Sequence, residues 1–72
     1  MRYMVVIEKG PKSYGAFVPD LPGCVAAAET EVEALELIQE AIQLHLDDLR
    51  ASGQPIPKPA SKSTFVETSH AA

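Results

Sequence analysis

Two short segments near the start of the chain alternate their apolar residues with the period of two that is typical of β-strands. They are Arg2–Glu8 and Tyr14–Val18, both rich in β-branched and aromatic residues. Gly10–Ser13 lies between them and favours a tight turn, because glycine permits a positive φ and proline restricts φ. The pattern predicts an antiparallel hairpin. After the rigid loop Pro19–Gly23, the small residues of Cys24–Ala28 predict a third strand.

The apolar period lengthens to about 3.6 residues after Thr30, which predicts an amphipathic helix. Thr30 and Glu33 have the spacing of a T-x-x-E capping box, in which each side chain satisfies a free N–H group at the start of the helix. Gly53 predicts the end of the helix, and Pro55 follows it. The apolar stripe of this helix comprises Val32, Ala34, Leu35, Ile38, Ala41, Ile42, His45, Leu46 and Leu49.

The segment after the helix differs in composition. Gln54–Pro59 alternates proline and predicts an extended chain, Thr64–Glu67 predicts a short edge strand, and Thr68–Ala72 is expected to fray. The element order is therefore β-β-β-α-β. We predict a two-layer α+β fold in which one long helix covers an antiparallel sheet, with residues 1–57 as the domain core and residues 58–72 as edge strand and tail.

Size and composition add constraints on assembly. A 72-residue chain buries only about 60% of the surface that its unfolded form exposes, and chains this short usually need a disulfide, a metal or a second copy. The single cysteine, Cys24, excludes an internal disulfide and suits the cytoplasm, and no apolar run approaches the ~20 residues that span a bilayer. We therefore expect a cytoplasmic homo-oligomer. Its candidate contacts are Met4 and Val6 on the second sheet face, with Leu37 and Leu44 beside the helical stripe.

Charge is distributed unevenly around a net value of −4. Eight of the ten acids but only one base, Arg50, lie between positions 20 and 50. An acidic body repels a phosphate backbone and attracts a basic protein, so we expect no direct nucleic-acid binding. The candidate partner contacts are Asp20, Leu21 and Pro22 in the loop, with Glu36, Glu40 and Asp47 on the helix. The alternative interpretations are that the loop is only a turn and that the acids form a solvated face.

Few residues offer catalytic chemistry. Cys24 has no histidine at a spacing typical of a nucleophilic pair, and His45 lies at the border of the helical apolar stripe. Metal-ligand histidine spacing and a glycine-rich phosphate loop are both missing from the sequence. We expect no enzymatic activity, no cofactor and no metal, and the roles of Cys24 and His45 stay open.

Residues 2–57 resemble the HicB-like antitoxin family. The resemblance rests on Tyr3–Glu8, on the run Tyr14–Cys24 that ends in Pro-Asp-Leu-Pro-Gly-Cys, on the capping residues with Ala34, and on Gly53–Pro57. It implies a partial ribonuclease-H-like fold. It also implies an antitoxin that neutralises HicA, a small basic mRNA-cleaving toxin, by covering its RNA-binding face and active histidine.

The sequence departs from that family in two respects. Many members continue into a C-terminal DNA-binding domain, which we do not expect here because the sequence stops about where that domain would begin, and the acids of ribonuclease H are not recognisable. The resemblance therefore does not imply operator binding or nuclease activity here. The alternatives to an antitoxin are an orphan self-associating binding module without a toxin and a metal-dependent nuclease.

Overall fold

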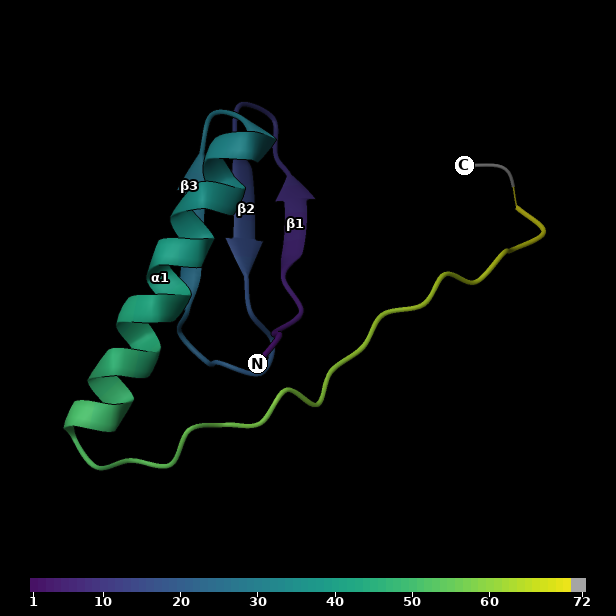
Figure 1. Ribbon diagram of the computed structural model, residues 1–72. Coiled ribbons are helices and arrows are strands. Elements are labelled where there is room, and N and C mark those ends of the chain that lie inside the picture. The colour runs from purple at the N-terminus through teal and green to yellow at the C-terminus, as the bar shows by residue number, and fades with distance from the viewer. Residues whose placement is uncertain (71–72) are drawn as a thin grey trace.

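The computed structural model, which describes residues 1–70, has three strands followed by one helix (Figure 1). The elements are β1 (Val6–Lys9), β2 (Tyr14–Phe17), β3 (Val25–Ala28) and α1 (Glu31–Ala51). The strands form one antiparallel sheet in the order β1-β2-β3, and α1 packs mainly on β2 and β3. The α+β class with a sheet and one long helix is confirmed.

The strands are shorter than the sequence pattern predicts. β1 and β2 are joined by the expected turn, in which the Gly10 N–H donates to the Ser13 carbonyl at 2.7 Å. Pairing of β1 starts at Val6, opposite Phe17, and not at Arg2. The reason is that β2 ends there, because Val18 donates its N–H to the Cys24 carbonyl at 3.2 Å and Pro19 has no N–H.

Both ends of α1 follow the local chemistry of the sequence. At the start, the Glu33 N–H donates to Thr30 Oγ1 at 3.1 Å, and Thr30 Oγ1 donates to the Glu33 carboxylate at 3.0 Å. At the end, Gly53 has a φ of 74°, and its N–H donates to the Arg50 carbonyl at 3.2 Å. The Gln54 N–H donates to the Leu49 carbonyl at 2.9 Å, and the two bonds together form a Schellman motif. The predicted helix and its ends are confirmed, but only the Thr30 half of the capping box forms as predicted, because the Glu33 carboxylate accepts from the Thr30 hydroxyl and not from a backbone N–H.

The core lies between α1 and the inner sheet face. Its largest fully buried side chains are Leu21 and Ile38, both 0% exposed, and each contributes about 1.5–3 kcal/mol by burial. Leu21 comes from the loop that was expected to present it to a partner. That expectation is corrected: hydrogen bonds fold the loop back, Leu21 N–H to Val18 O at 3.1 Å and Cys24 N–H to Leu21 O at 3.0 Å, and this turns the leucine inward. The remaining buried residues are small or medium: Ala16, Val18, Cys24 and Ala34.

The segment after the helix does not form the expected edge strand. Residues 54–70 run extended below the sheet and then away from the body beyond β1 (Figure 1). Phe65 is 99% and Val66 80% exposed, and Thr64–Glu67 pairs with no strand of residues 1–70. The radius of gyration is 14.4 Å, whereas a compact chain of this length has about 11 Å. The prediction of an edge strand is wrong because a strand needs a second strand to pair with, and the tail already runs away from β1 before residue 64 (Figure 1).

The last described residues are exposed, and α1 is not of the kind that crosses a membrane. Thr68–His70 is exposed, as fraying would require, whereas residues 71–72 lie outside the described part of the chain. Within residues 1–70 there is no helix whose length and apolar character would let it cross a membrane.

Candidate partner-binding surfaces

Asp20 fastens the tail to the Pro19–Gly23 loop. Its carboxylate accepts hydrogen bonds from the Ser61 N–H at 2.9 Å, the Ala60 N–H at 2.9 Å and the Ser61 hydroxyl at 2.8 Å. Nearby, the Tyr3 hydroxyl donates to the Pro57 carbonyl. The bonds from Ser61 and then Ala60 favour the charged form and lower the pKa of Asp20 below its ordinary value. The carboxylate predicted to meet a partner is thus already used within the chain.

Of the three predicted loop contacts, only Pro22 is freely exposed. Leu21 is in the core, and Asp20 is half-buried beneath the tail. No local pattern around Asp20 indicates its attachment to Ser61, which lies 41 positions away. The loop therefore organises the end of the sheet, and of its three predicted contacts Pro22 alone stays fully exposed.

The predicted helix contacts do share one exposed face. Glu36, Glu40 and Asp47 are all exposed on α1. Asp47 accepts from Gln43 Nε2 at 3.0 Å and lies 3.7 Å from Arg50, an exposed pair that contributes little to stability. Glu36 and Glu40 make no ion pair with any residue between 1 and 70. We call Glu36, Glu40 and Asp47 the acidic row; its negative charge is largely uncompensated.

The four predicted oligomer contacts are not brought together. Val6 pairs with Phe17, and Phe17 pairs with Val25, so these three residues form a row across the outer sheet face. Met4 lies at the open side of β1, and Leu37 and Leu44 are 42% and 69% exposed on α1. Leu44 lines a hollow beside β3, on the opposite flank of the helix from Met4. They therefore belong to different surfaces.

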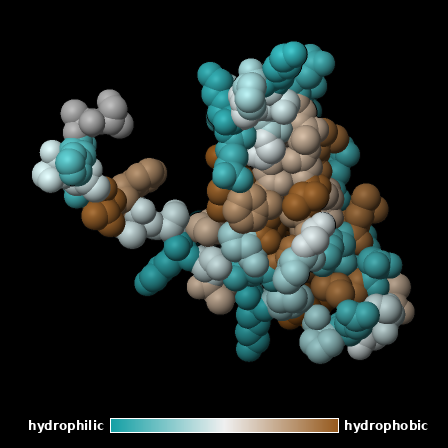
Figure 2. Space-filling model, turned by 180° about the vertical axis from the view of Figure 1, so that it is seen from behind, coloured by the Kyte–Doolittle hydropathy of each residue, from teal (hydrophilic) through white to brown (hydrophobic). Residues whose placement is uncertain are grey.

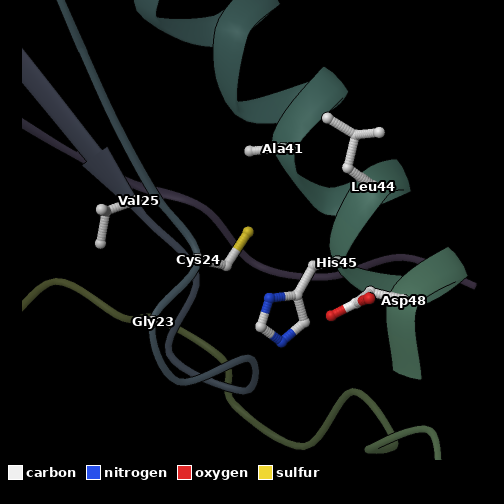
Figure 3. A pocket seen from close by; sticks show the side chains of 7 residues that line it. All are labelled: Gly23, Cys24, Val25, Ala41, Leu44, His45 and Asp48. Carbon is white, nitrogen blue, oxygen red and sulfur yellow. The ribbon is translucent and has the colours of Figure 1, made fainter. Parts of the chain in front are cut away.

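The hollow beside β3 brings Cys24, His45 and Asp48 to one place (Figure 3). It has a volume of about 480 Å³ and is open to solvent. The Cys24 sulfur points toward Ala41 and not toward the ring of His45 (Figure 3). Burial raises the pKa of the Cys24 thiol, whereas a nucleophile needs a lowered one. No group of three metal-binding side chains occurs within the described residues. The arrangement does not match a nucleophilic pair.

A larger groove runs along the other flank, between α1 and the chain that leads into β1. We call it the β1 groove; its volume is about 690 Å³. It exists because α1 packs mainly on β2 and β3 and leaves its β1 side uncovered. Residues 61–63 of the tail form one rim. Its apolar lining consists of Tyr3, Met4, Val5, Leu35, Ile38 and Ile42.

The geometry defines a small α+β domain with an acidic helix face and an apolar groove. The model of the HicB-like antitoxins of bacterial toxin–antitoxin systems matches residues 3–71. The chain belongs to this antitoxin family.

Individual relatives agree with this assignment. A UPF0150 protein of Helicobacter pylori is 54% identical over 46 residues, which are 64% of this chain and 64% of the relative. UPF0150 protein Ta0767 of Thermoplasma acidophilum is 39% identical over 92% of this chain and 97% of its own length. Antitoxin HicB 2 of Photorhabdus laumondii is 32% identical over 93% of this chain, which spans only 49% of that antitoxin.

Proposed function

We propose that this chain neutralises a small, basic, HicA-type mRNA-cleaving toxin by binding it with the acidic row of α1 and covering its RNA-binding face. The observation that carries the proposal is the exposed row itself, in which Glu36 and Glu40 have no ion-pair partner among residues 1–70. Membership of the antitoxin family supports a toxin as the partner. A basic ribonuclease carries the complementary charge, because it must itself attract RNA.

The acidic row suits recognition of a protein better than recognition of a nucleic acid. The net charge of −4 would repel phosphates, so we propose that the chain acts on the toxin and not on RNA or DNA directly. Occlusion needs no catalytic group in the antitoxin, which agrees with the raised pKa of the Cys24 thiol. We further propose that the complex forms in the cytoplasm, where mRNA is the substrate of such a toxin.

The first test is co-purification of the tagged full chain with any small basic protein that is encoded beside it. The proposal expects a stable complex in which RNA cleavage by the neighbour is suppressed. If the neighbour cleaves RNA equally well in the presence of excess chain, the inhibitor role is wrong.

A charge-reversal pair then tests the surface. Glu36→Lys with Glu40→Lys changes the acidic row, and Glu29→Lys with Glu31→Lys changes the net charge equally at exposed positions outside it. The row variant should slow association with the toxin about tenfold or more at low salt, and the difference should shrink as salt screens the charges. Equal slowing by both variants would mean that the row has no special role.

A further inference from the structure

The β1 side of the sheet has a strand edge that is unpaired among residues 1–70 and an apolar groove that is open. β1 pairs with β2 along one edge, and no strand of residues 1–70 pairs with its other edge. The β1 groove lies directly beside this side of the molecule, and its apolar wall includes Leu35, which is 40% exposed. A free strand edge next to an apolar groove offers both backbone hydrogen bonds and a place for one large side chain.

The tail carries a segment with matching properties. Thr64–Glu67 consists mainly of residues that favour strands, and its Phe65 is 99% exposed. Figure 2 shows brown atoms on the tail where it projects from the body, surrounded by solvent. A phenylalanine that is 99% exposed beside a valine that is 80% exposed leaves apolar surface in water, although its burial would be favourable.

The groove and the segment are linked by chain continuity. Ser61, Lys62 and Ser63 already form a rim of the groove, and Asp20 holds Ala60 and Ser61 in place. The next residues nevertheless run outward, away from their own β1 (Figure 1). One chain thus has a free strand edge beside an apolar groove and, a few residues further along the tail, a strand-like segment that pairs with nothing among residues 1–70.

We propose that two copies of the chain exchange Thr64–Glu67, each segment adding a strand to the free β1 edge of the other copy and placing Phe65 in its β1 groove. A mutual exchange uses both open features of each copy and closes with two-fold symmetry. Charge agrees with this approach: the groove lining includes Arg2 and Lys62 but no acid, whereas the exchanged segment carries Glu67. The exchange goes beyond toxin binding and requires no toxin.

The exchange assigns a surface to the homo-oligomer expected from the sequence. Met4 stays in the contact as a lining residue of the groove, whereas Leu37 and Leu44 lie outside it. The exposed position of Phe65 also makes a clean variant available, because a substitution there removes no contact within one chain.

The first experiment compares sedimentation of the full chain with that of Phe65→Asp, and uses Val32→Asp as the matched control. Val32 is a similarly placed apolar residue, 65% exposed on α1 and outside the groove. At micromolar concentration the unsubstituted chain and Val32→Asp should sediment at twice the single-chain mass of 7.7 kDa, and Phe65→Asp at the single-chain mass. Circular dichroism should show the same helix content in all three.

The second experiment distinguishes exchange from folding of the tail onto its own body. A spin label is attached at Ser69→Cys, which is exposed, while Cys24 is buried and its thiol is poorly reactive. Labelled chains are mixed with unlabelled, ¹⁵N-enriched chains. The amide signals of Leu35 and Gln39 in the enriched copy should broaden, and the broadening should vanish when the labelled chain also carries Phe65→Asp.

Three results would overturn the exchange. One is a single-chain mass for the unsubstituted protein. Another is a two-chain mass that survives Phe65→Asp but is lost in Leu37→Ser with Leu44→Ser, which would place the contact on the helix. The third is an enriched, unlabelled copy whose Leu35 and Gln39 amide signals do not broaden when the spin-labelled chains are added.

Discussion

Large apolar side chains occur both in the body of the molecule, residues 1–57, and in the tail, residues 58–70. Several of them are buried in the body, whereas those in the tail are exposed. In the body, Leu21 and Ile38 are 0% exposed, whereas in the tail Phe65 is 99% exposed. The hydrophobic free energy of these side chains is similar. What differs is the supply of neighbours: α1 and the sheet meet face to face, and the tail passes the body at a few polar contacts.

Those polar contacts explain how the tail is held without being packed. The tail is attached by hydrogen bonds from Ala60 and Ser61 to Asp20, and the Tyr3 hydroxyl holds the chain just before the tail by donating to the Pro57 carbonyl. Such bonds fix the path of the chain but bury little apolar surface. The path of the tail and the folding stability of the molecule therefore depend on different contacts. Packing within the body provides the stability, and the bonds to Asp20 direct Thr64–Glu67 away from the body.

The sharpest contrast comes from truncating one large apolar residue in each region. Ile38→Ala should lower the free energy of unfolding by about 2–5 kcal/mol, because it leaves a cavity between α1 and the sheet. Phe65→Ala should change it by less than about 0.5 kcal/mol at concentrations low enough to keep copies apart. Urea unfolding followed by circular dichroism measures both. Similar losses at the two positions would mean that the tail packs on its own body.

A smaller effect is expected at the start of α1. Thr30→Ala removes the acceptor of the Glu33 N–H bond and should cost about 1 kcal/mol of unfolding free energy. Thr30→Ser keeps the hydroxyl and serves as the control, with a change of a few tenths of a kcal/mol. Losses of the same size in both variants would show that the threonine methyl group, and not the cap, matters here.

The smallest effect is expected when acid releases the tail. The pKa of Asp20 is lowered below its ordinary 3.8 by the bonds from Ser61 and Ala60, so the attachment is complete above that pH and is lost as the pH falls through the lowered pKa. The amide signals of Ala60 and Ser61 should shift in this range, while those of the helix stay unchanged. Asp20→Asn is the control and should show no such transition. A transition that persists in Asp20→Asn would assign it to another carboxylate.

The elements of the fold were largely predictable from local pattern. The hairpin, the third strand and α1 with its ends at Thr30 and Gly53 all follow from neighbouring residues. Capping and turn formation involve groups only a few positions apart, so their chemistry is written in short stretches of sequence. The exposed acidic row was predictable for the same reason, because helical periodicity places Glu36 and Glu40 on one face.

The tertiary structure decided which residues those elements bury, hold and leave free. Leu21 belongs to the core because the loop folds back beneath the sheet, and Asp20 holds Ser61 across 41 positions. Thr64–Glu67 has the composition of a strand, yet it forms none within the described chain because no edge lies beside it. Periodicity and capping are properties of adjacent residues, whereas burial, attachment and strand pairing depend on which distant segments meet, and only the packed molecule brings those segments together.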